Sequence, residues 1–346
     1  MSYISWFADV GLADRPHVGG KGASLGELHG AGIAVPPGFI VRTSAFERFL
    51  AAIEVDCPVR GQIESLDAED LCAVTACCAA MRSRLQEAPL PAEVRGEIES
   101  AHAELSAAHG KALAVRSSAT SEDAADASFA GLQDTYLWVQ DLDQTVRKVR
   151  SCWASLYSVE SVAYRRRRKL PEQAVAMAVV VQTMVDARTA GVMFTRSPTT
   201  GDRSVITIEG AWGLGSAVVG GEVTPDRWVL SKVTGDITVR DISDKAIRHA
   251  PAVSGGIETR PVEEELRRAP CLSDEQLQTL RGIARRVERH YGCPQDIEWA
   301  LERASGEVLL LQSRPETVWS SRQAAPVARP AGNPLTHVMS VFGGRR

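Results

Sequence analysis

Four polar residues near the end of the sequence are of types that can hold a metal ion beside a phosphate group. Asp296 and Glu298 alternate with apolar residues, and Gln312 and Arg314 follow a second apolar run. Side chains two residues apart share one face of a strand. If the two strands pair as a hairpin, carboxylate, amide and guanidinium groups lie together. That set suits Mg²⁺ completed by phosphate oxygens, and a solvated hairpin face is the alternative.

Arg116 is a second candidate for phosphate chemistry. It lies in 114–123, where a β-rich run enters a hydroxyl-rich turn that ends in Glu122 and Asp123, and a Gly-containing segment follows at 128–135. An arginine in this setting can bind phosphate oxygens with two parallel N–H donors. A surface salt bridge to one of the two acidic residues is the alternative interpretation.

Segment 19–26 is rich in glycine and contains Lys21. Glycines let backbone amides approach an anion closely, and a helix is expected to begin just after them. The segment is not a Walker A loop, because Gly22 stands where that motif requires Ser or Thr and Arg15 stands where it requires Gly. An anion site and an ordinary flexible turn both remain open.

A second glycine pair, Gly213 and Gly215, does not complete a dinucleotide-binding fingerprint. Val218 occupies the position of the third glycine or alanine, and no clear strand–helix–strand unit surrounds it. We expect a loop that lies close to another part of the molecule.

The elements that must position these residues are helical blocks mixed with clusters of strands, which predicts an α+β or mixed α/β fold. Helical spacing, breaks at Pro89 and Pro91, and a capping box at Ser273 predict helices over 43–50, 66–87, 91–108, 143–168 and 274–290. The expected strands cover 112–117, 174–182, 191–195, 205–209, 296–301 and 307–312.

Composition narrows the class of protein. The chain has 346 residues, 44% of them hydrophobic, and 39 basic against 43 acidic side chains give a net charge of −4. This predicts an ample core and disfavours a general nucleic-acid binder. No apolar run approaches the length of a membrane span, no secretory signal is evident, and the seven irregularly spaced cysteines indicate reduced thiols. We expect a cytoplasmic protein with no membrane partner.

Five consecutive cations at 165–169 are the only strongly basic run. They could contact a phosphate backbone, but no aromatic residues are interleaved with them. A solvated helix end, or a docking patch for an acidic partner, is the favoured interpretation.

Taken together, the motifs resemble the N-terminal ATP-grasp domain of the phosphoenolpyruvate synthase and pyruvate phosphate dikinase family, which rifampin phosphotransferase and phenylphosphate synthase share. The resemblance covers most of the chain. Its blocks are 18–22, 115–120, 128–131, 191–195, 212–215, 296–299 and 312–317. It implies two subdomains that clamp ATP: a helical, Gly-rich part at 1–110 forms the first with 111–190, 191–320 forms the second, and 321–346 is a tail or linker.

The resemblance also implies roles for individual residues. Lys21 and Arg116 would hold the ATP phosphates, Arg314 would contact the terminal phosphates, and these three would be the catalytic residues. Glu298 and Gln312 would carry Mg²⁺. The remaining nucleotide-binding residues would be Gly131 and Thr135 in a lid, Gln182 near the adenine, and Met184 and Val185 in the hinge.

In this family ATP phosphorylates a histidine on a swivelling domain, AMP and phosphate are released, and the phosphoryl group passes to an acceptor. None of the seven histidines here lies in the family's phosphohistidine setting, and His337 resembles it only superficially. We therefore expect the ATP-binding subunit of a split phosphotransferase, with the phosphohistidine and acceptor-binding domains on a partner subunit.

Phenylphosphate synthase is the favoured precedent for this division, with phenol as acceptor. A phosphoenolpyruvate synthase-like or rifampin phosphotransferase-like component is the alternative. A non-catalytic ATP-sensing module is a third possibility, which the presence of all the phosphate and metal residues disfavours.

Overall fold

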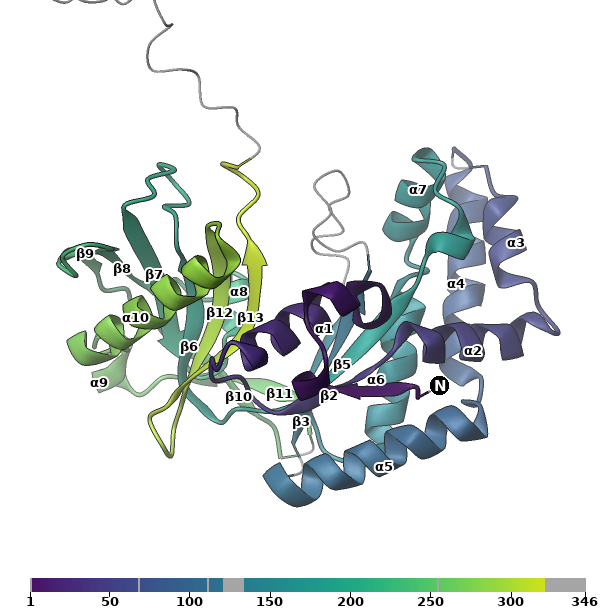
Figure 1. Ribbon diagram of the computed structural model, residues 1–346, viewed down its shortest axis with the longest axis horizontal. Helices are drawn as coiled ribbons and strands as arrows, with labels where there is room; N and C mark the ends of the chain where they lie inside the picture. The colour runs from purple at the N-terminus through teal and green to yellow at the C-terminus, as the bar shows by residue number, and fades with distance from the viewer. Residues whose placement is uncertain (1, 68, 111, 121–133, 254, 321–346) are drawn as a thin grey trace, which may run out of the picture.

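The structure, a computed structural model, describes residues 2–67, 69–110, 112–120, 134–253 and 255–320. These residues form a mixed helix-and-sheet architecture built on two antiparallel sheets (Figure 1). The helices are α1 (Arg15–Gly30), α2 (Thr43–Glu54), α3 (Val59–Glu64), α4 (Leu71–Glu87), α5 (Ala92–His109), α6 (Leu142–Ser155), α7 (Val159–Arg167), α8 (Ser216–Val219), α9 (Glu264–Arg267) and α10 (Asp274–Tyr291). None of these helices combines the length and apolar character needed to cross a bilayer.

The first sheet has five strands in the order β1-β2-β5-β3-β4. Its strands are β1 (Ile4–Trp6), β2 (Gly38–Val41), β3 (Leu113–Ala119), β4 (Thr135–Val139) and β5 (Met177–Thr183). Every neighbouring pair in this sheet is antiparallel.

The second sheet has six strands in the order β13-β12-β6-β7-β8-β9, again all antiparallel. Its strands are β6 (Ala187–Phe194), β7 (Val205–Trp212), β8 (Asp226–Ser231), β9 (Ile237–Asp241), β12 (Gln295–Glu302) and β13 (Val308–Pro315). A separate hairpin pairs β10 (Ile247–Pro251) with β11 (Ile257–Pro261).

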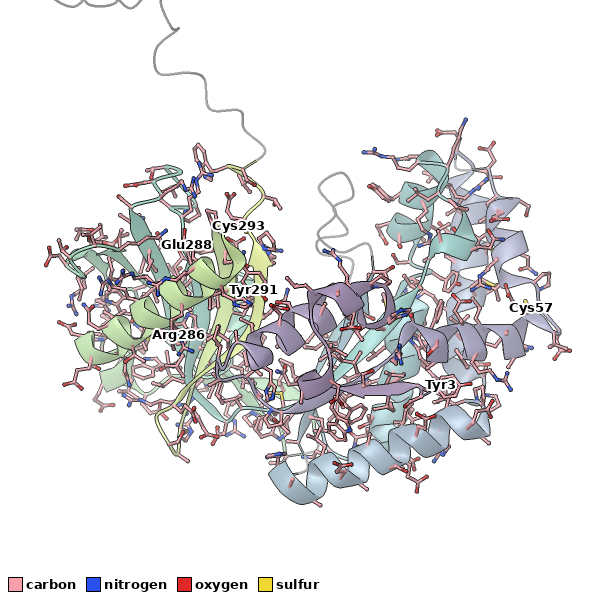
Figure 2. The ribbon with its side chains drawn as sticks, viewed as in Figure 1. Tyr3, Cys57, Arg286, Glu288, Tyr291 and Cys293 are labelled. Atoms are coloured by element: carbon pink, nitrogen blue, oxygen red, sulfur yellow. The ribbon has the colours of Figure 1, made fainter. Side chains whose placement is uncertain are left out.

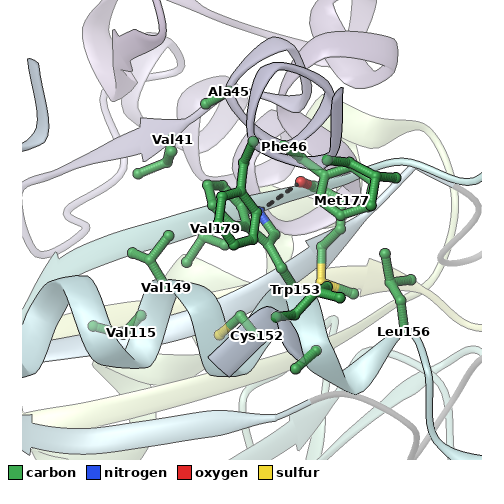
Figure 3. Close-up of a cluster of buried hydrophobic side chains, with 14 of the residues drawn as sticks. Val41, Ala45, Phe46, Val115, Val149, Cys152, Trp153, Leu156, Met177 and Val179 are labelled. Atoms are coloured by element: carbon green, nitrogen blue, oxygen red, sulfur yellow. Dashed lines mark hydrogen bonds between the residues drawn. The ribbon is translucent and has the colours of Figure 1, made fainter. Parts of the chain in front are cut away.

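The central strand of the first sheet, β5, is buried along its whole length because helices pack on both faces. Val179 and Val181 point into a core shared with α2, α4, α5 and α6, while Ala178 and Val180 point into the core that also contains α1 and α10. Figure 3 shows the first core around Trp153, whose indole N–H donates a 3.2 Å hydrogen bond to the Met177 carbonyl. Alternation along one strand thus joins two cores.

The structure confirms most of the predicted elements, and the 296–301 and 307–312 strands do form a hairpin. The single helix predicted over 143–168 was wrong, because α6 and α7 are separate helices. Ser158 begins the second of them by accepting a hydrogen bond from the Ser161 N–H at 3.2 Å. The strands that the sequence prediction missed are β1, β2, β4, β8, β9, β10 and β11.

The prediction that 165–169 is a solvated run was wrong at its first member. Arg165 is fully buried and forms two hydrogen bonds with the Glu172 carboxylate, at 3.0 and 3.1 Å. A third bond, of 2.6 Å, reaches the Leu156 carbonyl. Arg165 therefore stabilises the turn between α6 and α7, and only Arg167, Arg168 and Lys169 of this run are exposed.

The capping box that the sequence predicts at the start of α10 is present. Ser273 accepts a hydrogen bond from the Gln276 N–H at 3.3 Å, and the Gln276 side chain accepts one from the Ser273 N–H at 2.9 Å. We expect Ser273→Ala to lower the free energy of unfolding by about 1 kcal/mol, because an N-terminal amide of α10 loses its partner. Urea unfolding measures this. Ser100→Ala, at an exposed site within α5, should change stability by less than about 0.5 kcal/mol.

Candidate functional site

The hairpin of β12 and β13 brings the four C-terminal candidates together as predicted. Glu298 lies directly opposite Gln312, and Asp296 lies directly opposite Arg314. Ile297 and Trp299, between and beyond the two acidic residues, are buried, so the carboxylates share the other face of the strand. The Arg314 Nε atom is 3.5 Å from the Asp296 carboxylate.

Arg116 connects the two sheets. It belongs to β3 of the first sheet, yet its Nη2 atom donates to Glu298 Oε2 at 3.0 Å and to Gln312 Oε1 at 2.7 Å in the second sheet. Its Nη1 atom donates to the Leu311 carbonyl at 2.7 Å. The side chain is 9% exposed, so it is not the surface arginine of the alternative interpretation, and Glu122 lies outside the described residues, as does Asp123.

A cavity of about 350 Å³ lies at this junction between the two sheets. Its walls come from β3, β4 and β5 on one side and from β6, β12 and the 213–216 loop on the other. Six of the predicted nucleotide-binding residues line it, namely Arg116, Thr135, Gln182, Met184, Val185 and Glu298. The rest of the lining is mainly apolar, which is typical of small-molecule sites with a few fixed polar groups.

Thr135 and Gln182 reach the cavity from either side of β3. Thr135 on β4 lies opposite Arg116 on β3, and Gln182 on β5 lies opposite Ala114 on β3. Gln182 is 2% exposed, and its side-chain N–H donates to the Pro36 carbonyl at 3.1 Å. This bond fixes which end of the amide is the donor and orients the side chain.

Met184 and Val185 form the connection between β5 and β6, and therefore between the two sheets. The Met184 N–H donates to the Ala112 carbonyl at 2.9 Å, which holds the connection against the start of β3. Val185 is buried together with Ala187 in a small apolar cluster beside the cavity. Gly131, the other predicted lid residue, lies outside the described residues.

Helix α1 contains the predicted glycine segment, so the expectation of a turn followed by a helix was only partly correct. The helix begins at Arg15 and is interrupted at Gly19, where φ is 71° and ψ is 178°. A Cβ atom at Gly19 would lie 2.0 Å from the Ser118 carbonyl oxygen, so only glycine fits. The Ser118 hydroxyl then accepts from the Gly22 N–H at 3.1 Å and donates to the Val18 carbonyl at 2.9 Å.

The same helix also contacts the second sheet. The Ser24 hydroxyl donates to the Ser313 carbonyl of β13 at 2.7 Å. Figure 2 labels Tyr291 at the end of α10, and its hydroxyl oxygen is 3.4 Å from the Ser24 hydroxyl. Burial raises the pKa of the Tyr291 phenol above its ordinary value. Lys21 is buried within α1 but does not line the cavity.

Asp134 is a residue that sequence reasoning missed. Its carbonyl accepts hydrogen bonds from the Ser117 N–H at 3.0 Å and from the Ser117 hydroxyl at 3.1 Å, next to Arg116. Its carboxylate accepts from the Tyr136 hydroxyl at 2.7 Å. Burial is the main cause that raises the pKa of Tyr136, and the hydrogen bond to Asp134 raises it further. Asp134 therefore fixes the position where β4 enters the site.

The 213–216 loop was predicted to lie close to another part of the molecule, and it does. Gly213 has φ of 79°, and a Cβ atom there would lie 2.5 Å from the His249 carbonyl oxygen. Leu214, Gly215 and Ser216 line the cavity. The Ser216 hydroxyl is also 2.8 Å from His249 Nδ1. The sequence signal was the pair of glycines, which indicated close approach but not the neighbour.

Two predicted residues lie near the cavity without lining it. Gln312 does not line the cavity itself, but it accepts a hydrogen bond from Arg116, which does. Arg314 lies beside Asp296, farther along the hairpin, and its side chain is 48% exposed. The oxygens of Glu298 and Gln312 are hard donors at adjacent positions, which fits Mg²⁺ with further oxygens from a ligand. Within the described part of the chain, no group of three or more His, Cys, Asp or Glu residues forms a separate metal cluster.

Comparison with known proteins gives a consistent result. Residues 15–332 match the family described as pyruvate phosphate dikinase, AMP/ATP-binding domain. The chain is 40% identical over 93% of its length to a probable phosphoenolpyruvate synthase of Staphylothermus marinus, of which the match covers 42%. It is 38% identical over 94% of its length to the phosphoenolpyruvate synthase of Aeropyrum pernix, of which the match covers 44%.

A rifampicin phosphotransferase of a Streptomyces species is 42% identical over 89% of the chain, and the match covers 35% of that protein. The chain thus spans less than half the length of these curated relatives. The family match covers most of the residues that build both sheets and the cavity between them. The chain therefore belongs to the pyruvate phosphate dikinase AMP/ATP-binding domain family.

Proposed function

We propose that this chain binds ATP with Mg²⁺ in the cavity between the two sheets, as an ATP-grasp domain, and donates a phosphoryl group. The observation that carries the proposal is the bridge from Arg116 to Glu298 and Gln312 at the cavity. It places a guanidinium and two oxygen donors where the two sheets meet. A triphosphate with its metal requires this combination of charges.

In this proposal each sheet is the centre of one subdomain, and the expected division at residue 190 falls within β6 of the second sheet. Residues 321–346, the expected tail or linker, lie outside the described residues. The apolar walls enclose the adenine, and the Gln182 side-chain oxygen accepts from its amino group, since the Gln182 N–H already donates to Pro36. Met184 and Val185 line the hinge.

The phosphates lie at the opposite end of the cavity in this arrangement. Arg116 contacts them, with Lys21 and Arg314 adding positive charge from α1 and β13. The chain then contributes orientation and charge stabilisation to the transferred group, and it excludes water from it. Thr135, at the start of β4, contacts the nucleotide as part of the lid.

Mg²⁺ would be held by Glu298 and Gln312 and would neutralise charge on the phosphate oxygens. Both side chains accept hydrogen bonds from one Arg116 nitrogen in this structure, so they already share a single cation. Arg116 can shift its hydrogen bonds to phosphate when the metal takes over these two oxygens. In this proposal, metal binding and phosphate binding are therefore linked through one arginine.

The phosphoryl acceptor we propose is a histidine on a partner subunit, with overall conversion of ATP, water and histidine to AMP, phosphate and phosphohistidine. The alternative arrangement has the histidine on a further domain of the same polypeptide. The favoured final acceptor is a phenol, as in phenylphosphate synthase. The relatives support as alternatives a phosphoenolpyruvate synthase-like or rifampicin phosphotransferase-like component.

ATP labelled at the β-phosphate tests this function. The purified chain is incubated with labelled ATP and Mg²⁺, with and without host lysate, and assayed for AMP and for acid-labile label on protein. Label on a second polypeptide, only when lysate is present, is the expected result and identifies the partner. Label on this chain itself would place the histidine here. ATP binding without AMP or label would replace phosphoryl transfer with ATP sensing.

Glu298→Gln is expected to lower ATP turnover by about 100-fold and to raise the Mg²⁺ concentration needed for half-maximal rate. The amide still accepts the hydrogen bond from Arg116, so the fold is retained while the negative charge of the carboxylate, which would attract the metal ion, is lost. Steady-state rates across a magnesium titration measure both effects. Glu302→Gln, at the last residue of β12, is the matched control. Equal magnesium dependence of the two variants would exclude Glu298 as a ligand.

A further inference from the structure

A second cavity, of about 280 Å³, lies next to the one described above and shares only Ala187 and Leu214 with it. None of the predicted nucleotide-binding residues contributes to its walls. Its charged lining consists of Arg248, Arg260 and Arg303 against a single carboxylate, Asp186. Three guanidiniums facing one acidic group give the cavity a net positive charge.

Two of these arginines lie directly opposite each other. Arg248 on β10 and Arg260 on β11 are register partners in the antiparallel hairpin. Like charges at directly opposite positions destabilise a strand pair. Each has a glutamate partner, Glu263 for Arg248 at 2.9 Å and Glu258 for Arg260 at 2.7 Å, but neither glutamate lines the cavity. The two glutamates reduce the repulsion between the guanidiniums from outside the cavity, and neither glutamate occupies the cavity itself.

The third arginine is held in place from a different part of the chain. Arg303 follows β12, and its backbone N–H donates to the Asp186 carbonyl at 2.9 Å. Its Nη2 atom donates to the Ala187 carbonyl at 3.2 Å, and its Nε atom is 3.4 Å from the Asp186 carboxylate. The Arg248 Nε atom is buried and has no hydrogen-bond partner among the described residues. Three separate segments thus bring arginines to one cavity, and the Nε–H of Arg248 is left available as a donor.

We propose that this cavity binds a small oxyanion of the phosphate class, either inorganic phosphate or the phosphate group of a small monoester. Planar guanidiniums bind phosphate oxygens with paired hydrogen bonds, and an anion between Arg248 and Arg260 reduces the repulsion that their glutamate partners leave. A volume near the lower end for small-molecule sites leaves room for a monoester. The proposal does not rest on the proposed function, because none of the three arginines contributes to the nucleotide cavity.

Isothermal titration calorimetry of the full chain tests this site, with inorganic phosphate as the probe. The nucleotide cavity is first saturated with a non-hydrolysable ATP analogue and Mg²⁺. We expect phosphate to bind under these conditions, and Arg260→Gln or Arg303→Gln to weaken binding by about tenfold. Arg240→Gln, at an exposed arginine on β9, should leave phosphate binding unchanged. Melting curves verify that each variant is folded.

A parallel titration with glycerol 2-phosphate compares the two kinds of ligand. Tighter binding of inorganic phosphate would identify the free anion as the ligand, and tighter binding of glycerol 2-phosphate would identify a monoester. The proposal is overturned if phosphate gives no binding heat at millimolar concentration. It is also overturned if the ATP analogue displaces phosphate, or if both arginine variants bind phosphate as the unmodified chain does. Failure of the ATP analogue to bind, with arginine-dependent phosphate binding retained, would contradict the nucleotide site alone.

Discussion

Arg116→Ala is expected to lower ATP turnover by at least about 1,000-fold. The substitution removes the cation that spans the two sheets and leaves Glu298 and Gln312 without their 3.0 and 2.7 Å donor. A group that stabilises charge in a water-excluded site is worth about 10²–10³ in rate, and here the same group also orients the metal ligands. Steady-state AMP formation, with host lysate as the source of the proposed phosphoryl acceptor, measures the effect.

Two further variants make this result specific. Arg116→Lys keeps the charge but cannot form paired hydrogen bonds, so we expect a rate between those of the alanine variant and the unmodified chain. Arg188→Ala is the matched control, because Arg188 is exposed on β6 and does not line the cavity. Normal turnover by a folded Arg116→Ala protein would exclude this arginine from the site.

Gly19→Ala is expected to lower the free energy of unfolding by about 3 kcal/mol or more. The new Cβ atom would lie 2.0 Å from the Ser118 carbonyl oxygen and 2.3 Å from its hydroxyl oxygen, and the backbone at φ of 71° is one that alanine rarely adopts. Helix α1 has to move away from β3 to relieve the overlap. Lys21 moves with it, so ATP affinity should fall as well.

The same helix supplies the control for this substitution. Gly30, the last residue of α1, has no neighbouring atom within 4 Å of the position that a Cβ atom would take, and its φ is not positive. We expect Gly30→Ala to be neutral or to stabilise by up to about 1 kcal/mol, through the unfolded chain. Urea unfolding of both variants measures the difference. Equal stabilities would show that contact between Gly19 and Ser118 does not position α1.

The sequence predicted the hairpin of Glu298 and Gln312 because alternation along each strand determines its buried face, and a short connection joins the two strands. It could not predict the contacts of Arg116, which is 182 residues from Glu298 in the chain. That contact depends on how two separate sheets pack. The start of helix α1 was placed too late for a related reason: glycine has low helix propensity, and hydrogen bonds to Ser118 and Ser313 hold the glycine-rich part of the helix in place.

The local signals also failed where tertiary packing determined burial. Arg165 looks like its four basic neighbours in the sequence, and only the packing of α7 against Glu172 shows that it is a buried structural residue. Short strands such as β1 and β2 lack the length for a visible alternation. Strand β2 forms because β5 provides a partner, and β1 then pairs with β2. The sequence thus indicated which residues to consider for the candidate site, and it could not predict the contacts between the sheets.

The most direct test of the central claim is a crystal structure of this chain with Mg²⁺ and a non-hydrolysable ATP analogue. We predict the adenine beside Gln182 and Met184, the phosphates at Arg116, and the metal bound by Glu298 and Gln312. Arg116 should then donate to phosphate oxygens instead of bridging these two side chains. A nucleotide bound outside the cavity between the sheets, or a metal held by other residues, would contradict the account.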